Sequence, residues 1–301
     1  MKINLYKAEG SATLPDFTSS KELNDPANYI PSQELIDAVN IAMLLGQPLL
    51  LTGEPGTGKT QLAYHLAHFF NLDKPLIFNI QTSSLAADLF YKYDALGHFQ
   101  YNQNNSNRLS PAEIEEQFIT YNALGQAIRS QKRVVVLIDE IDKAPRDLPN
   151  DILFAIENMH FKVPEINQEF VSDEKYRPII IMTSNSEKNL PDAFLRRVAY
   201  FHITFPSSDQ LLYILSRKTN NVQIRDLKKI IQHFGSIRDL QLKKPPSTAE
   251  LIYWTFLLLK LKFPIELLGG SLEMHERKLL LSSYVVLTKN KEDLDLLKNL
   301  M

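Results

Sequence analysis

A glycine-rich segment near the start of the chain, PLLLTGEPGTGKT at residues 48–60, constrains the fold more than any other feature. The apolar run that opens it, LLL at 49–51, is typical of a buried strand in a parallel sheet. The residues from Gly53 to Thr60 fit the spacing G-x-x-x-x-G-K-[ST] of a phosphate-binding loop between a strand and a helix. The alternative is a turn that only joins the two elements.

A loop of this kind binds the phosphates of a nucleotide through its backbone. Glycines let the chain turn tightly with its N–H groups pointing inward, and the positive end of the next helix attracts the β- and γ-phosphates. Lys59 is placed to reach the β/γ oxygens, where it acts in catalysis, and Thr60 to bind Mg²⁺. The predicted nucleotide-binding residues of the loop are Gly53, Glu54, Pro55, Gly56, Thr57, Gly58, Lys59 and Thr60.

A second motif, RVVVLIDE at residues 133–140, reads as a buried β-branched strand that ends in two acids. This is the Walker B pattern, and it lies downstream of the glycine-rich loop. We expect Asp139 to hold Mg²⁺ and Glu140 to polarise the water that attacks the γ-phosphate. If the two acids only ended a strand in a loop, Mg²⁺ would lack its second protein partner.

A third polar strand end follows the apolar run PIIIMT at residues 178–183. Ser184 and Asn185 come directly after it, and open α/β sheets bind ligands at the carboxyl ends of their strands. The Asn185 amide could therefore orient the attacking water or contact the γ-phosphate. The alternative is an asparagine that only forms a turn.

Tyr29 and Ile30 precede the helix expected over 31–45, just upstream of the loop strand. Residues at this place are candidates for contact with the adenine base, and ordinary packing at the helix entry is the alternative. His65 and His68 have a spacing that can bind metal, but no third ligand accompanies them, so we expect surface or core histidines.

The pattern of elements divides the chain into an arm at 1–28, an αβ nucleotide-binding domain at 29–205 and an α-helical domain at 206–301. Gln100–Arg108 is polar and predicts a loop or hairpin tip, whereas the alternation around 159–173 predicts a β-hairpin. Expected strands are 49–51, 75–80, 133–139, 178–183 and 200–204, and expected helices are 31–45, 59–70, 110–129, 148–159, 208–218, 221–234, 247–262, 272–288 and 292–300.

The composition of the chain limits its possible partners and its cellular compartment. The net charge is −2, so no global attraction toward DNA or an anionic membrane is evident. The absence of cysteine excludes disulfides and thiolate metal sites and suits a reducing cytosol. We see no signal peptide and no run approaching the roughly 18 apolar residues of a membrane span. These observations favour a soluble cytoplasmic protein.

The order of these motifs, with the helix AFLRR at 193–197 after them, resembles AAA+ ATPases and most closely the MoxR clade. The stretches YIPSQELIDAVNIAMLLGQPLLLTGEPGTGKT and NSEKNLPDAFLRR resemble members that work beside von Willebrand A-type (VWA) proteins. The resemblance spans roughly residues 28–262. It implies an α/β fold, a P-loop AAA+ core with a five-stranded parallel sheet, a C-terminal all-α lid, and ATP and Mg²⁺ as cofactors.

The resemblance also implies roles for individual residues. Asn185 corresponds to the sensor-1 residue, and Arg197, with Arg196 beside it, to an arginine finger that completes the site of a neighbouring subunit. Such a head-to-tail contact implies a homo-oligomeric ring or spiral, a hexamer in the family. The hairpin at 159–173 and part of 85–109 correspond to family insertions. Where many relatives carry a sensor-2 arginine, this chain has Ala249.

The implied function is ATP hydrolysis by a ring that remodels a protein client or assists metal or cofactor insertion. One alternative is a nucleotide-gated scaffold that binds ATP and assembles but scarcely hydrolyses it. Another is a DNA-directed AAA+ motor, against which the near-neutral charge argues. A local basic stripe keeps that alternative open: Arg225, Lys228, Lys229, Arg238, Lys243 and Lys244.

Overall fold

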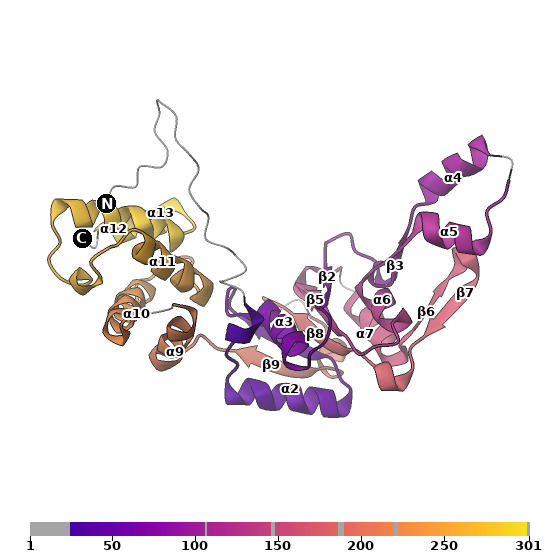
Figure 1. Ribbon diagram of the computed structural model, residues 1–301, viewed down its shortest axis with the longest axis horizontal. Helices are drawn as coiled ribbons and strands as arrows, with labels where there is room; N and C mark the ends of the chain where they lie inside the picture. The colour runs from indigo at the N-terminus through magenta and orange to yellow at the C-terminus, as the bar shows by residue number, and fades with distance from the viewer. Residues whose placement is uncertain (1–24, 106, 146–147, 186–189, 220–221, 300–301) are drawn as a thin grey trace. The chain divides into compact units, whose positions relative to one another are not determined.

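The computed structural model describes residues 25–105, 107–145, 148–185, 190–219 and 222–299. Their contacts form two compact units (Figure 1). The αβ unit comprises Pro31–Gly53 and Lys59–Ile203. Among the described residues, the helical unit comprises 25–30, Glu54–Gly58 of the glycine-rich loop, and 204–299 apart from 220–221.

The αβ unit is built on a five-stranded sheet in the order β2-β5-β8-β1-β9, with every neighbouring pair parallel. β1, the loop strand, therefore lies between β8 and β9. All its residues are buried, as its apolar sequence predicts. The backbone N–H of Ser184, just past β8, donates to the carbonyl of Leu51 at 2.9 Å. The strands are β1 (Leu49–Gly53), β2 (Leu76–Asn79), β5 (Val135–Asp139), β8 (Ile179–Thr183) and β9 (Ala199–Ile203).

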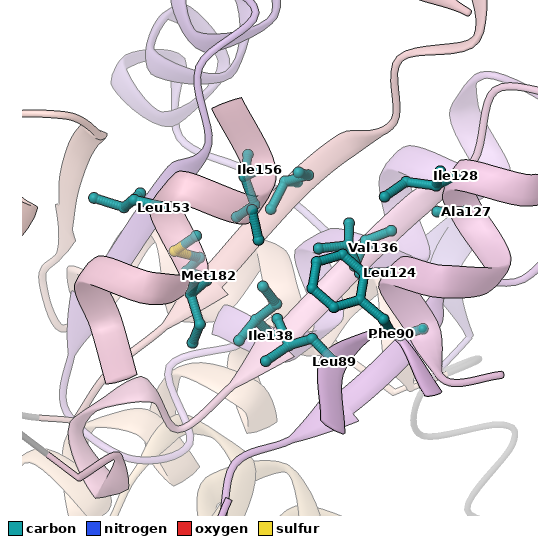
Figure 2. Close-up of a cluster of buried hydrophobic side chains, with 14 of the residues drawn as sticks. Leu89, Phe90, Leu124, Ala127, Ile128, Val136, Ile138, Leu153, Ile156 and Met182 are labelled. Atoms are coloured by element: carbon teal, nitrogen blue, oxygen red, sulfur yellow. The ribbon is translucent and has the colours of Figure 1, made fainter. Parts of the chain in front are cut away.

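Helices and apolar side chains bury this sheet. Val136 and Ile138 of β5 pack with Met182 of β8 and with side chains of α6 and α7 (Figure 2). The intervening residues Val135 and Leu137, which point to the other face, are equally buried. Helix α3 contacts β1, β5 and β8. The helices around the sheet are α2 (Gln33–Leu45), α3 (Lys59–Phe69), α6 (Ala123–Arg129), α7 (Leu148–Asn158) and the short α8 (Asp192–Leu195).

The segment expected as one helix over 110–129 is instead two helices separated by a strand. Ser110 and Glu113 cap α5 (Pro111–Phe118) reciprocally. Ile119–Tyr121 then forms β4, which pairs antiparallel with β3 (Tyr91–Tyr93). β-branched and aromatic residues at 119–121 suit a strand, so the pairing interrupts the helical pattern.

The polar stretch expected as a loop over 100–108 is helical in its first half. Helix α4 (Ala95–Asn104) covers its first half, and the Asp94 side chain caps the helix by accepting from the Gly97 N–H. No residue of α4 is buried, so its sequence lacks the apolar periodicity from which a helix could be predicted.

The predicted hairpin is present as β6 (His160–Val163) and β7 (Gln168–Val171), paired antiparallel. An aromatic cluster joins it to the β3–β4 pair. The Phe161 ring on β6 stacks with Phe90 at 4.8 Å and with Phe170 at 5.1 Å between centroids. The Arg129 guanidinium lies 3.7 Å from the centroid of the Tyr121 ring. The two hairpin-like elements are therefore parts of one packed body.

The helical unit has its own core. Trp254 and Tyr284 are fully buried, and the Trp254 indole N–H donates to the Ser283 hydroxyl at 2.8 Å. The buried Asp293 carboxylate accepts the backbone N–H groups of Lys243 and Lys244. The helices are α9 (Ser208–Lys218), α10 (Ile224–Arg238), α11 (Thr248–Lys260), α12 (Met274–Ser283) and α13 (Lys291–Asn299). The helix expected over 272–288 ends early, in a 3₁₀ turn at Tyr284–Val286.

Short 3₁₀ turns connect these elements at Pro26–Asn28, Ala86–Leu89, Ile141–Lys143, Pro164–Ile166, Glu174–Tyr176 and Ile265–Leu267. In the part of the chain that the structure describes, no helix is both long and apolar enough to cross a membrane.

Candidate functional site

The glycine-rich loop leaves the sheet at Gly53, whose backbone has a φ of +139°. A side chain at this position would meet the carbonyl oxygen of Ile203, since an added Cβ would lie only 2.5 Å from it. The Lys59 ammonium folds back and donates to the Gly53 carbonyl at 2.8 Å. Gly53 is thus required both by backbone conformation and by close packing on the edge strand.

Lys59 is the first residue of α3 and is only 7% exposed. Burial lowers the pKa of its ammonium below the usual value, while the nearby carboxylates of Asp139 and Asp142 act in the opposite direction. A desolvated cation beside a loop of N–H donors attracts a polyphosphate strongly. Lys59 therefore fits the predicted contact with the β- and γ-phosphates.

Thr60 and Asp139, the two predicted Mg²⁺ ligands, come together in the structure. The Thr60 hydroxyl lies 3.3 and 3.4 Å from the two carboxylate oxygens of Asp139. Both are oxygen donors of the kind that Mg²⁺ prefers, and Mg²⁺ commonly uses one or two protein groups while retaining water. The pair fits the predicted metal site.

Thr183, which sequence reasoning passed over, is the third member of this group. Its hydroxyl donates to the Asp139 carboxylate and accepts the backbone N–H of Glu140 at 3.1 Å. The side chain is 2% exposed. The available signal was its position at the end of the apolar run PIIIMT, because adjacent parallel strands end at the same edge of a sheet.

Glu140 begins a 3₁₀ turn with left-handed backbone angles, φ 60° and ψ 48°. A residue other than glycine rarely adopts this conformation, and its N–H bond to Thr183 helps to hold it. The Glu140 carboxylate accepts from the Lys143 ammonium at 2.5 Å. Glu140 thus turns away from the strand directly after Asp139.

Asn185 lies just past the end of β8, as predicted. Its backbone N–H donates to the Asp142 carboxylate at 3.3 Å. Asp142 also acts electrostatically on Lys59. The structure therefore connects Asn185 to the acidic segment that follows β5.

Arg196 and Arg197 follow the short helix α8 and are both exposed. The Arg197 guanidinium lies 4.0 Å from the Glu157 carboxylate, and both side chains are about half exposed, at 52% and 53%. A surface pair of this kind contributes little to stability.

The central residues of the loop, Glu54–Gly58, are held within the helical unit. The Tyr29 ring lies against Gly58, where an added Cβ would be 3.0 Å from a ring carbon. Burial raises the pKa of the Tyr29 phenol. Tyr29 is thus beside the loop, and Tyr29 and Ile30 are both partly buried.

Two further features lie outside this group of residues. A cavity of about 810 Å³ opens where β1 and β8 begin, the opposite edge from Gly53 and Thr183, and none of the predicted site residues line it. Among the described residues, no group of three or more histidine and acidic side chains is arranged to hold a metal ion, so His65 and His68 form no such cluster.

A parallel sheet that carries a glycine-rich loop, a buried lysine and an acidic strand end defines a P-loop nucleotide-binding protein. Residues 48–198 match the family described as AAA domain (dynein-related subfamily). The chain belongs to this family. It is accordingly an AAA+ ATPase, an enzyme that binds and hydrolyses ATP, and this part of the resemblance seen in the sequence is confirmed.

The chain is also similar to solved structures at low identity. The AAA domain of FIGL-1 in complex with ADP is 18% identical, with a TM-score of 0.43 over 84% of this chain and 77% of that one. A variant of RuvB from Thermotoga maritima is 14% identical, with a TM-score of 0.45 over 84% and 74%. A closed-state reconstruction of Hsp104 with ATPγS and FITC-casein is 20% identical, with a TM-score of 0.42 over 65% and 37%.

Proposed function

We propose that this chain is a Mg²⁺-dependent ring ATPase of the MoxR type, which uses ATP hydrolysis to remodel a protein client or to assist metal or cofactor insertion. In this proposal 29–205 is the nucleotide-binding domain, 206–301 is the lid and 1–28 is an arm. A VWA-type protein is the proposed partner, on the resemblance of the segments 29–60 and 185–197.

The observation that carries the proposal is the bonded group formed by Thr60, Asp139 and Thr183 at the end of the sheet. Mg²⁺ bound there would neutralise charge on the β- and γ-phosphate oxygens. Thr60 and Asp139 supply the oxygen donors. Thr183 holds the Asp139 carboxylate in place, and Lys59 supplies a positive charge that burial makes more effective.

Glu140 is the proposed base that polarises the attacking water. Its left-handed backbone begins a turn directly after Asp139, and the two adjacent carboxylates are proposed to have different roles. Lys143 pairs with Glu140 in this structure, and Glu140 would have to exchange that partner for water during turnover. Asn185 is proposed to orient the same water, and Tyr29 and Ile30 to contact the adenine.

Arg197, with Arg196 beside it, is proposed to act on the nucleotide of a neighbouring subunit. The support is their exposure and the weak engagement of Arg197, which has a carboxylate only at 4.0 Å. An arginine offered in this way is available to a second copy of the chain. Head-to-tail use of such a contact closes a ring or winds a spiral, and we propose a hexamer.

The DNA-directed alternative rests on the basic stripe, and three of its six members already have protein partners. Arg238 contacts Glu54, the Lys229 ammonium donates to the Glu266 carbonyl, and Lys243 pairs with Glu292. The two ion pairs, those of Arg238 and Lys243, reduce the positive charge that the stripe can offer to phosphates. A protein client is therefore the better-supported partner.

ATP turnover measured against protein concentration tests the proposal. A ring with shared sites should show specific activity that rises as subunits assemble, whereas a scaffold should stay nearly inactive at every concentration. The Glu140→Gln variant should bind ATP, accumulate as ATP-bound assemblies in light scattering, and lose turnover by about 10²–10⁴-fold. Normal cycling by this variant would remove Glu140 from the proposed role.

A further inference from the structure

Arg238, the last residue of α10, contacts three separate segments of the helical unit. Its guanidinium lies 3.5 Å from the centroid of the Phe205 ring. One terminal nitrogen donates to the Pro246 carbonyl, in the turn before α11. The other donates to the Glu54 carboxylate at 3.1 Å. A planar guanidinium can make all these contacts at once, since it stacks through its face and donates through its edge.

The surroundings of Arg238 favour a strong interaction. Its side chain is 16% exposed, whereas Glu54 is 48% exposed. The arginine is therefore largely withdrawn from water and always charged, while its partner reaches it from the loop. A partly desolvated, charge-assisted pair of this kind is stronger than an ordinary surface ion pair.

The start of α11 holds the same loop from another position. The Ala249 N–H donates to the Gly56 carbonyl at 3.3 Å. An added Cβ at Gly56 would lie 2.3 Å from the Ser247 hydroxyl, which caps α11. Ala249 therefore hydrogen-bonds to the loop through its backbone, and its methyl side chain lies close to Gly56. Ala249 lies where many relatives have an arginine, and its side chain carries no charge.

We propose that Arg238 is a positioning residue for the nucleotide: by binding Glu54, it ties the phosphate loop to α10 and to the turn before α11. In this way it couples ATP binding to the helical unit in a chain that has alanine at position 249. The inference rests on the proposed nucleotide site. It assigns to Arg238 a role within that site that the glycine-rich motif does not contain.

The first experiment uses the full-length protein without nucleotide. In Arg238→Met, amide hydrogen exchange at Glu54, Gly56, Thr57 and Gly58 should be about 3- to 10-fold faster than in the wild type. Amides of α11 should stay protected, because its core does not depend on Arg238. Arg217→Met is the matched control, since Arg217 is an exposed arginine of the same unit that lies 5.7 Å from the Tyr213 ring.

The second experiment measures binding of a fluorescent ATP analogue. Arg238→Met and Glu54→Gln should each weaken binding by about 3- to 10-fold, and the double variant should lose no more than the worse single variant. Arg238→Lys should recover only part of the affinity, because an ammonium keeps the charge without the planar edge. Arg217→Met should bind like the wild type.

Two results would overturn the inference: unchanged exchange in the loop of Arg238→Met, or single losses of affinity that simply add in the double variant. Failure of the proposed function looks different, because the wild type itself would then bind no ATP analogue. Loop exchange in the absence of nucleotide would still test the Arg238–Glu54 contact in that case.

Discussion

Thr183 and Asp139 lie at the ends of adjacent parallel strands, and the Thr183 hydroxyl donates a hydrogen bond to the Asp139 carboxylate. The same hydroxyl accepts the Glu140 N–H. One buried side chain thus fixes both a predicted metal ligand and the backbone of the predicted base. Its removal should affect the chemical step more than the binding of nucleotide.

Thr183→Val should lower ATP turnover by about 10- to 100-fold, the usual range for groups that orient a metal ligand. Valine keeps the shape and removes the hydroxyl, so Asp139 loses a donor and the Glu140 N–H loses its acceptor. Steady-state ATPase assays with Mg²⁺ titration provide the measurement. Thr183→Ser is the control and should keep most activity, while wild-type rates in Thr183→Val would rule out the positioning role.

Arg197→Ala should retain ATP binding and lose turnover by about 10³–10⁵-fold, as expected for an arginine that acts from a neighbouring subunit. The Lys59→Ala variant should instead lose nucleotide binding, while its own Arg197 remains intact and can act on a neighbouring subunit. Mixing the two inactive variants should restore part of the activity, because some interfaces combine an intact loop with an intact Arg197. The absence of any recovery in mixed assemblies would contradict a site shared between subunits. The Arg196→Ala variant tests separately whether Arg196 contributes to ATP turnover.

The helical unit should lose stability in mild acid through His233. Burial lowers the pKa of the His233 imidazole, which stacks on Trp254 at 5.7 Å and hydrogen-bonds to the Tyr284 hydroxyl at 2.8 Å. Because the folded pKa lies below the unfolded value of 6.5, the unfolded chain binds more protons. This contribution is therefore present above pH 6.5 and is lost as the pH falls toward the folded pKa.

Urea unfolding at about pH 7.5 and at about pH 5.5 measures this effect. The free energy of unfolding of the wild type should fall more between the two values than that of His233→Phe, which keeps an aromatic ring and cannot titrate. Equal pH dependence in the two proteins would show that folding does not lower the pKa of His233.

Substitution of two helical glycines by alanine should change the free energy of unfolding in opposite directions. At Gly125 of α6, an added Cβ would lie 1.9 Å from the Phe90 carbonyl oxygen, so Gly125→Ala should destabilise the protein by about 1–3 kcal/mol. At Gly235 of α10, nothing lies within 4 Å. Gly235→Ala should therefore raise the free energy of unfolding by about 0.5–1 kcal/mol. Denaturant unfolding of the two variants and the wild type measures these changes. A lower free energy of unfolding in Gly235→Ala would contradict the open space found around Gly235.

The parallel core was predictable because its strands carry strong local signals. LLL at 49–51, VVVLI at 134–138 and PIIIM at 178–182 are short apolar runs typical of buried parallel strands, and each is followed by polar residues at its end. The loop and Asp139 followed from spacing alone. The meeting of Thr60 with Asp139 was implied by strand ends that share one edge of the sheet.

The remaining features depend on contacts between residues distant in sequence. β4 forms because Ile119–Tyr121 pairs with Tyr91–Tyr93, and the periodicity within 110–129 does not predict that pairing. Thr183 acts through Asp139, 44 positions away, and Arg238 through Glu54, 184 positions away. Pairings of this kind are decided by tertiary structure, so propensity and pattern cannot reveal them.

β8 occupies the place between the loop strand and the acidic strand, and its end is bonded in both directions: Ser184 to Leu51, and Thr183 to Asp139. The chain that continues from this end leads to α8 and then to Arg196 and Arg197. The segment that carries the two surface arginines therefore continues, in sequence, from the strand end that is hydrogen-bonded to both the loop strand and the acidic strand. We expect a change at the loop strand or at Asp139 to alter the hydrogen bonds of this shared strand end.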